Sequence, residues 1–456
     1  MTHAFDPMIL REYDVRGVVG ATLHDSDAFA IGRGFATCVR RAGGARIAVG
    51  YDGRLSSPAL EAALVAGLTA SGVDVVRIGL GPTPMLYYAE AHLGVDGGIQ
   101  ITGSHNPADQ NGFKFVLQHA PFFGAELQQL AALAEAGDWS EGAGTVTDAD
   151  VLDAYVDRLM VGYTGGAYRI GWDTGNGASG PVIERLVKRL PGEHHLLFTA
   201  VDGTFPNHHP DPSEAENLAD LTALVVRERL DFGFAFDGDG DRIGAIDAQG
   251  RVLAGDQILA VLAEPVLHDL PGATIIGDVK MSGALFDRIR ALGGVPLMWK
   301  TGHSHMKAKL AETGAPLAGE MTGHVFFGHD FYGVDDAHFA AVRLIDAVHR
   351  GDHTLAELRD AMPAMVNTPE LRFPVDDARK FAVVEEVLAR LTTEGATVNR
   401  IDGARVDTAD GWWLLRASNT QSALVARAEA RDQAGLDRLL AQIDTQLAAS
   451  GIARPR

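Results

Sequence analysis

The chain has 456 residues, 46% of them hydrophobic and 22% charged, and its formal net charge is −21. This length predicts three or four domains, since one domain usually spans roughly 100 to 200 residues. The acidic surplus argues against a nucleic-acid partner, because nucleic-acid binding needs clustered Lys and Arg. The sequence has no apolar run of about 20 residues, no N-terminal signal pattern and one cysteine, Cys38. We therefore expect no disulfides or membrane contact, and a cytoplasmic location.

Strand-like segments alternate with helix-length stretches along the first 300 residues. Each apolar strand runs into a glycine-rich or polar loop, the place where open α/β sheets bind ligands. The segments are Arg46–Asp52, Val73–Leu80, Gly97–Ser104, Arg169–Gly177, Asp231–Asp241, Ala273–Lys280 and Val295–Gly302. This pattern predicts α/β domains whose mixed or parallel sheets are covered by helices.

The last hundred residues have a different pattern. Strand-like runs around GWWLLRAS and ALVARAEA precede an amphipathic helix over Gln433–Ala449, which predicts a smaller α+β domain. Turn-rich breaks near 142–150, 247–251 and 361–370 divide the chain into residues 1–149, 150–250, 251–366 and 367–456. We expect three α/β domains followed by the α+β domain. The oligomeric state stays open, because no coiled-coil seam or apolar stripe stands out.

The turn TGSHNP presents Ser104 without the G-x-S-x-G motif that surrounds a lipase-type nucleophile. A serine hydroxyl is a weak nucleophile at neutral pH, whereas a phosphorylated serine is a good phosphoryl donor once a metal neutralises its oxygens. His105 and Lys114 are candidates for moving protons or stabilising phosphate charge. A lone serine in such a turn is as often a capping residue, so this interpretation depends on a metal site nearby.

The segment FDGDGDR supplies such a site, with Asp237, Asp239 and Asp241 at alternate positions after an apolar strand. This spacing puts the three carboxylates on one side of the backbone, and the intervening glycines let the chain curl around an ion. Hard oxygen ligands of this kind suit Mg²⁺. Ser104 then becomes a phosphate carrier beside the metal.

Two other interpretations of FDGDGDR are available. An EF-hand loop needs Gly and Glu where this chain has Arg242 and Ala248, so that interpretation fails. A haloacid-dehalogenase-type phosphatase also has an Asp pair after a strand, and a later Asp335–Asp336 pair. Its motif, however, has Thr or Val where this chain has Asp241, and the third carboxylate favours a metal site.

Three further polar loops lie downstream. GEMTGH offers Glu320, Thr322 and His324, which suit the vicinal hydroxyls of a sugar but are also consistent with a plain loop. KTGHSH contains His303 and His305, but no third ligand stands at a spacing that would make a zinc site. RASNTQ combines a guanidinium with small polar side chains and backbone N–H groups, a composition that suits a dianionic phosphate.

In this order and at these separations, TGSHNP, DGDGDR, GEMTGH and RASNTQ resemble the α-D-phosphohexomutase superfamily, most closely its bacterial phosphomannomutase/phosphoglucomutase group. The resemblance covers nearly the whole chain. Supporting stretches are REYDVRGVVG, VGYDGRLSSP, DTGNGASG and FPNHHPDPSEAENL. The resemblance implies four domains around a central cleft, with one loop of each domain reaching the active site.

The resemblance also implies roles for individual residues. Ser104 is the phosphoserine, and an oxygen on it joins the three aspartates as ligands of Mg²⁺. Further catalytic candidates are His105, Lys114, Arg242, Arg16, His303 and His324. Candidates for substrate binding are Tyr13, Lys280, His303, Glu320, Thr322 and His324, with Arg416, Ser418, Asn419 and Thr420 holding the phosphate that does not react.

The activity that the resemblance implies is interconversion of hexose 1-phosphate and hexose 6-phosphate, an intramolecular phosphotransfer. Phosphoserine gives its phosphate to the sugar, a hexose 1,6-bisphosphate forms as intermediate and activator, and the other phosphate returns to Ser104. Met321 and the TGSHNP loop favour mannose and glucose phosphates over the phosphoglucosamine mutase alternative. An Asp-based sugar phosphatase is the second alternative. The sequence does not distinguish mannose from glucose, which differ only in the orientation of the 2-hydroxyl.

Overall fold

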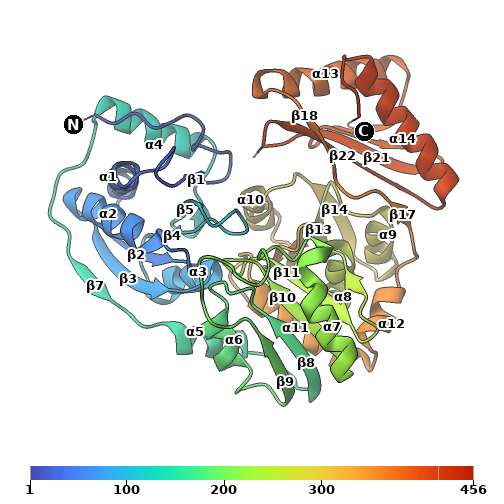
Figure 1. The fold of residues 1–456 in the computed structure, drawn as a ribbon, viewed down its shortest axis with the longest axis horizontal. Helices are drawn as coiled ribbons and strands as arrows, with labels where there is room; N and C mark the ends of the chain where they lie inside the picture. Colours follow the sequence, from blue (N-terminus) through green and yellow to red (C-terminus); the bar gives the residue numbers. More distant parts are fainter. Residues whose placement is uncertain (1, 420, 455–456) are drawn as a thin grey trace.

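The structure is a computed structural model that describes residues 2–419 and 421–454. It contains four sheets that follow one another along the chain, each with its own helices (Figure 1). The first three belong to α/β domains and the last to an α+β domain, as the sequence predicts. In the described residues, no helix combines the length and apolar character needed to cross a bilayer.

The first sheet has the strand order β1-β5-β4-β2-β3-β7. Its strands are β1 (Val15–Val18), β5 (Gln110–Leu117), β4 (Gly97–Ile101), β2 (Arg46–Tyr51), β3 (Asp74–Leu80) and β7 (Val146–Asp148), with β6 (Ala120–Pro121) paired to β5. Its helices are α1 (Asp25–Arg41), α2 (Ser57–Ala70), α3 (Thr83–His92) and α4 (Ala125–Ala136). Strand β2 runs parallel to both β3 and β4, so the loops after β2 and β4 leave the same edge of the sheet.

The second sheet has the order β12-β11-β10-β8-β9. Its strands are β12 (Val252–Leu253), β11 (Ile243–Asp247), β10 (Phe232–Phe236), β8 (Tyr168–Asp173) and β9 (Gly192–Leu197). Its helices are α5 (Leu152–Leu159), α6 (Gly180–Leu186) and α7 (Ala219–Glu228), with the 3-10 turn η1 (Ala215–Leu218). All five residues of β10 are buried. Strands β10 and β11 form an antiparallel hairpin, and its turn carries the three alternating aspartates.

The third sheet has the order β14-β13-β15-β16. Its strands are β14 (Val295–Trp299), β13 (Thr274–Asp278), β15 (Leu317–Gly319) and β16 (Val325–Phe327). Its helices are α8 (Gly255–Asp269), α9 (Gly283–Ala291), α10 (His303–Thr313), α11 (Ala337–Gly351) and α12 (Leu355–Asp360). One apolar cluster runs through the second and third sheets and reaches the first through α3, which holds these three domains together.

The fourth sheet is antiparallel, with the order β17-β22-β21-β20-β19. Its strands are β17 (Val366–Asn367), β22 (Ala423–Ala430), β21 (Gly411–Ala417), β20 (Ala404–Asp407) and β19 (Val398–Asn399), with β18 (Leu371–Pro374) beside β22. Helices α13 (Asp377–Thr393) and α14 (Gln433–Ala448) share a separate apolar core with it. The C-terminal helix begins where the apolar periodicity predicts and ends one residue earlier.

Candidate functional site

The loop that follows β4, residues 102–110, is called the serine loop here. Ser104 is 1% exposed and has a φ of 49°, in the left-handed region that a residue with a side chain rarely adopts. Its amide donates to Thr102 Oγ1 at 2.8 Å, and its Oγ donates to Asp237 Oδ2 at 2.7 Å. The structure therefore brings the predicted carrier serine into contact with the predicted metal loop across 133 residues of chain.

The metal loop, residues 237–242, forms the turn between β10 and β11. The carboxylates of Asp237, Asp239 and Asp241 are fully buried, and one oxygen of each lies within 4.8 Å of the other two. Lys114, on β5 of the first domain, donates from Nζ to Asp239 Oδ2 at 2.8 Å and also to Asp241. This ammonium offsets part of the negative charge that the hairpin turn concentrates.

The three aspartates fit a divalent cation. The Oδ1 atoms of Asp239 and Asp241 are buried and have no hydrogen-bond partner among the described residues. Asp237 Oδ1 accepts the backbone N–H groups of Asp241 and Arg242, each at 3.1 Å, which fixes the turn. Buried carboxylate oxygens without donors are costly unless a cation pairs with them, and oxygen ligands of this kind are those that Mg²⁺ prefers.

The pKa values of this cluster follow from burial and charge. Burial, with the charges of Asp239 and Asp241, raises the pKa of Asp237 well above its usual range. Burial also opposes ionisation of Asp239, but Lys114 lowers the pKa of that carboxyl overall. For Lys114, burial is outweighed by the two carboxylates, which raise the pKa of the ammonium. The Lys114 side chain is therefore charged throughout the neutral range.

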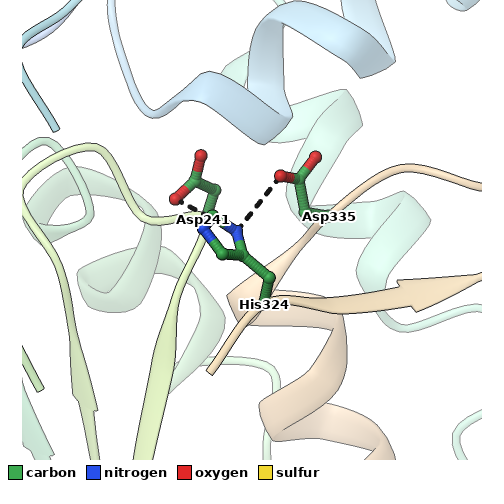
Figure 2. Close-up of side chains that lie close together, drawn as sticks. All are labelled: Asp241, His324 and Asp335. Atoms are coloured by element: carbon green, nitrogen blue, oxygen red, sulfur yellow. Dashed lines mark ion pairs between the residues drawn. The ribbon is translucent and has the colours of Figure 1, made fainter. Parts of the chain in front are cut away.

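His324, in the turn between β15 and β16, connects the metal loop to the third domain (Figure 2). Arg242 Nε donates to His324 Nε2 at 3.0 Å. Nδ1 lies 3.2 Å from Asp335 Oδ2 and 3.6 Å from Asp241 Oδ1, as the dashed lines in Figure 2 mark. Because a guanidinium only donates, Nε2 accepts, which places a ring hydrogen on Nδ1, facing the two carboxylates. With its hydrogen directed at the carboxylates, this imidazole pairs with them, so we interpret Asp241, His324 and Asp335 as a polar cluster.

His303 stands beside His324 at the start of α10. The two imidazole centroids are 5.7 Å apart with nearly parallel planes, and neither ring nitrogen of His303 has a hydrogen-bond partner in the described part of the chain. Burial, and then the charge of Lys307, lowers the pKa of His303 well below its usual range. The ring is therefore neutral at pH 7, which leaves it able to accept a proton at one nitrogen and to donate from the other.

Three more residues of the predicted set lie in the third domain. Glu320 is buried and its Oε1 accepts the N–H of Gly302 at 2.6 Å, while burial raises the pKa of its carboxyl. Lys280 Nζ donates to Glu370 Oε2 at 3.3 Å, between the third and fourth domains. Thr322 is half-buried in the same turn as Glu320. Their contacts with sugar hydroxyls stay predictions.

The end of β21 and the loop after it carry the predicted phosphate site. Arg416 is 6% exposed and its Nε donates to Asp402 Oδ2 at 2.9 Å. Asn419 Nδ2 donates to the hydroxyl of Tyr13 at 2.6 Å, and that hydroxyl donates to the carbonyl of Thr301 at 2.9 Å. Tyr13 thus joins the first, third and fourth domains, and a cavity of about 370 Å³ lies beside these residues.

Ser418 and Thr420 complete the predicted phosphate-binding set. Ser418 Oγ accepts the N–H of Gln421 at 3.1 Å within the same turn. Thr420 lies outside the described residues.

Two more predicted residues flank the serine. Arg16 Nη1 donates to Asn106 Oδ1 at 3.0 Å and to the Gly103 carbonyl at 3.3 Å. His105 Nδ1 is 3.2 Å from Ser104 Oγ, and burial lowers the pKa of this imidazole, as do the nearby charges of Arg242 and Arg16. Both side chains contact the serine loop, and their catalytic roles stay predictions.

The structure adds residues that the sequence did not single out for the site. Asp335 was considered only as part of a phosphatase motif, whereas Arg54 stood unassigned in VGYDGRLSSP. Arg54 donates to the Ser104 carbonyl, and Asp335 accepts from Lys307 Nζ at 3.0 Å. His305 packs against Tyr13 and Phe123 and belongs to neither possible metal cluster in the described residues.

Comparison with known proteins gives matches along almost the whole chain. Residues 7–141, 152–250 and 254–365 match the phosphoglucomutase/phosphomannomutase alpha/beta/alpha domains I, II and III, and residues 370–446 match the C-terminal domain. A Pseudomonas putida phosphomannomutase/phosphoglucomutase is 42% identical over 97% of this chain and 96% of its own length. A Neisseria gonorrhoeae phosphoglucomutase is 43% identical over 94% of this chain and 95% of its own length. The crystal structure of a phosphoglucomutase/phosphomannomutase family protein from Burkholderia thailandensis superposes with a TM-score of 0.94 at 43% identity, covering 99% of this chain and all of that one.

Proposed function

Since the chain belongs to the phosphoglucomutase/phosphomannomutase family, we propose that it interconverts the 1-phosphates and 6-phosphates of mannose, glucose or both through a phosphoserine at Ser104. The enzyme is an isomerase that acts on small-molecule hexose phosphates by phosphoryl transfer. Its relatives support this activity over the phosphatase and phosphoglucosamine mutase alternatives.

The observation that carries the proposal is the contact of Ser104 Oγ with Asp237 at 2.7 Å, in a buried site with two further aspartates and Lys114. A hydrolase that used Asp237 as its nucleophile would need that carboxylate exposed to substrate. Here both oxygens of Asp237 are already engaged, one by the serine hydroxyl and one by backbone N–H groups. This arrangement supports Ser104, and not Asp237, as the residue that carries phosphate.

The proposed transfer has two halves. In the first, a hydroxyl oxygen of the bound hexose monophosphate bonds to the phosphorus on Ser104 while the bond between Oγ and phosphorus breaks; the sugar hydroxyl gives up its proton to a base, and Oγ takes up a proton. The product is a hexose 1,6-bisphosphate. In the second half, this intermediate presents its other phosphate, Ser104 Oγ bonds to that phosphorus, and the sugar oxygen leaves with a proton.

The residues around Ser104 stabilise the charge of the phosphoryl group and transfer the proton of the reacting hydroxyl. When bound to the three aspartates and a serine phosphate oxygen, Mg²⁺ would neutralise negative charge on the phosphoryl group. Arg16 on β1, Lys114 on β5 and Arg242 in the metal loop supply further positive charge. We assign the mobile proton to the stacked imidazoles His303 and His324, because burial keeps His303 neutral and His324 lies at the metal loop.

The phosphate that does not react requires a second binding site. We propose that Arg416, Ser418, Asn419 and Thr420 hold the phosphate that is not reacting, while Tyr13, Lys280, Glu320 and Thr322 contact the sugar. The hydrogen bonds from Asn419 to Tyr13 and from Tyr13 to Thr301 support a site assembled from three domains. Such assembly helps to exclude water, which would otherwise hydrolyse the phosphoserine.

Substitution of Ser104 tests the function. The wild-type protein, primed with glucose 1,6-bisphosphate and Mg²⁺, should convert glucose 1-phosphate and mannose 1-phosphate to their 6-phosphates in coupled assays, without releasing phosphate. Ser104→Ala should abolish both conversions, and mass spectrometry should find one phosphate, on Ser104, in the wild type and none in the variant. Full mutase activity in Ser104→Ala would refute the proposal. Phosphate release that depends on Asp237 would favour the phosphatase, and binding without turnover would favour a sugar-phosphate binding protein.

A further inference from the structure

Arg54 lies against the serine loop, and its side chain is buried between that loop and its neighbours. It follows β2, the parallel neighbour of β4, so the two loops leave the sheet side by side. Its guanidinium donates to the carbonyls of four residues of the serine loop, at 2.5 to 2.8 Å: Ser104, Asn106, Pro107 and Gln110. The side chain is 0% exposed, so no solvent contact competes with these hydrogen bonds.

Asp52 holds the other edge of this guanidinium. Its Oδ2 accepts from Arg54 Nε at 3.2 Å, from Thr102 Oγ1 at 2.8 Å and from the N–H of Gly103 at 3.2 Å. Its Oδ1 accepts from Ser57 Oγ at 2.7 Å and from the Arg54 N–H at 3.1 Å. Asp52 accepts from donors of the serine loop, and Arg54 donates to carbonyls of the same loop. A buried ion pair whose polar atoms all have partners therefore lies against the loop.

The second domain closes the remaining side of Arg54. The ring of Phe205 lies over the guanidinium, with Cζ 5.2 Å from the ring centroid. Gly103 presses on it from the serine loop, since a Cβ on Gly103 would lie 2.5 Å from Arg54 Cζ. The guanidinium therefore has one available position, and that position determines where the loop carbonyls lie.

The carbonyl of Ser104 is the point at which this arrangement reaches the metal loop. It accepts from Arg54 Nη2 at 2.7 Å on one side, and a Cβ on Gly238 would stand 2.3 Å from its oxygen on the other. The same residue holds the unfavourable φ of 49° that directs its Oγ to Asp237. A conformation of this kind persists only where surrounding contacts over-determine it.

We propose that Arg54 is a positioning residue that holds the serine loop in the conformation in which Ser104 Oγ faces the metal loop, whether or not the serine carries phosphate. The proposal rests on the proposed function, because it assigns Arg54 an effect on phosphoryl transfer and none on sugar binding. Arg54 reaches the reaction only through the backbone of Ser104. Lysine cannot replace it, because one ammonium cannot span four carbonyls as a planar fork does.

The test compares Arg54→Lys with Arg33→Lys in the full-length protein. Arg33 is a suitable control because it is also a largely buried arginine of the first domain, donating to Ser71, Ser140 and Glu141 and to no residue of the serine loop. A displacement of about 1 Å in a reacting group can cost roughly a hundredfold in rate. We therefore expect Arg54→Lys to lower kcat about 10- to 100-fold with KM changed less than twofold, and to slow phosphorylation of Ser104 by glucose 1,6-bisphosphate by the same factor.

Hydrogen exchange supplies a measurement that does not depend on the mutase activity. The N–H groups of Gly103, Asn106 and Gln110 are hydrogen-bonded in the serine loop. Their exchange should be at least tenfold faster in Arg54→Lys, with unchanged circular dichroism, and unaltered in Arg33→Lys. If the wild type lacks mutase activity but the exchange result holds, the proposed function fails and the loop-positioning role survives.

Other results would overturn the proposal. A folded Arg54→Lys variant with more than half of the wild-type kcat would do so, as would a loss confined to KM or an equal loss in Arg33→Lys. Asp52→Asn provides a second variant, which should show the same changes in the same direction. If neither variant folds, Arg54 is a folding residue and the positioning role is wrong.

Discussion

Gly238→Ala is the sharpest test of how closely the serine and metal loops meet. An alanine Cβ at this position would lie 2.3 Å from the Ser104 carbonyl oxygen and 3.2 Å from its carbon. A carbon and an oxygen in contact are normally about 3.3 Å or more apart, so the two loops must separate by about 1 Å. The obstacle is backbone and not a flexible side chain, so rotation of a side chain cannot relieve it.

The expected effect falls on phosphoryl transfer. A separation of about 1 Å between Ser104 and the metal loop should reduce kcat roughly a hundredfold, which corresponds to about 2.7 kcal/mol in the activation free energy. The free energy of unfolding should fall by about 1–3 kcal/mol, as is typical of overpacking. The assay is conversion of glucose 1-phosphate primed with glucose 1,6-bisphosphate, with Mg²⁺ binding measured by calorimetry on the same protein.

Gly351→Ala is the matched control. Gly351 ends α11, and a Cβ there would meet no heavy atom closer than 3.5 Å, the distance to His353 Cδ2. This variant should keep wild-type kcat and gain up to about 1 kcal/mol of stability from helix propensity. Our account of the loop contact would be refuted if Gly238→Ala kept more than half of the wild-type activity, or if Gly351→Ala lost as much.

Three further predictions use other parts of the molecule. Lys114→Met leaves the buried carboxylates of the metal loop without their ammonium, which should lower the free energy of unfolding by about 3–5 kcal/mol. The melting temperature should fall, Mg²⁺ should partly restore it, and EDTA should lower it further. A melting temperature that does not respond to Mg²⁺ would contradict this. Burial raises the pKa of the Cys38 thiol to about 11. At pH 8 this thiol should therefore react with a disulfide reagent about a hundredfold more slowly in the native protein than in protein unfolded by urea. Equal rates in the two states would contradict this prediction. Burial opposes protonation of His208, but the ion pair with Asp173 raises the pKa of that imidazole overall. The stability that this ion pair contributes is complete below the unfolded-state pKa of about 6.5 and is lost as the pH rises through the folded-state pKa. The melting temperature of the wild type should therefore exceed that of His208→Gln by more at pH 6 than at pH 9, and a difference that grows with pH would refute this.

The proposed reacting groups could be selected from the sequence because the chemistry assigned to them needs unusual residue types in short runs. Three aspartates at alternate positions, or a serine between glycine and histidine, have few structural explanations once they occur together. The strand-to-loop pattern also placed these residues at sheet edges, and the structure confirms that Ser104 and Asp237 meet there. Their contact could not be derived from spacing, since the two residues are 133 positions apart in the sequence and lie in different domains.

The supporting residues could not be found in this way, because each depends on atoms brought together by the whole fold. Arg54 looks like any arginine after a strand, and its role appears only when four carbonyls from another loop surround it. Asp335 was visible as half of an acidic pair, but the two members separate in function. Asp336 caps α11 by accepting the N–H of Phe339, while Asp335 faces His324 and accepts from Lys307.

His324 shows how such a supporting contact can change the chemistry assigned to a motif. From GEMTGH alone the imidazole could donate or accept at either nitrogen. Arg242 occupies Nε2 as a donor, which directs the hydrogen on Nδ1 toward Asp335 and Asp241. For His324 to take a proton at Nε2 it must first release Arg242, whereas neither nitrogen of His303 has a hydrogen-bond partner among the described residues. Proton uptake at Nε2 of His324 therefore requires Arg242 to move, and a phosphate group has the charge to draw that guanidinium away.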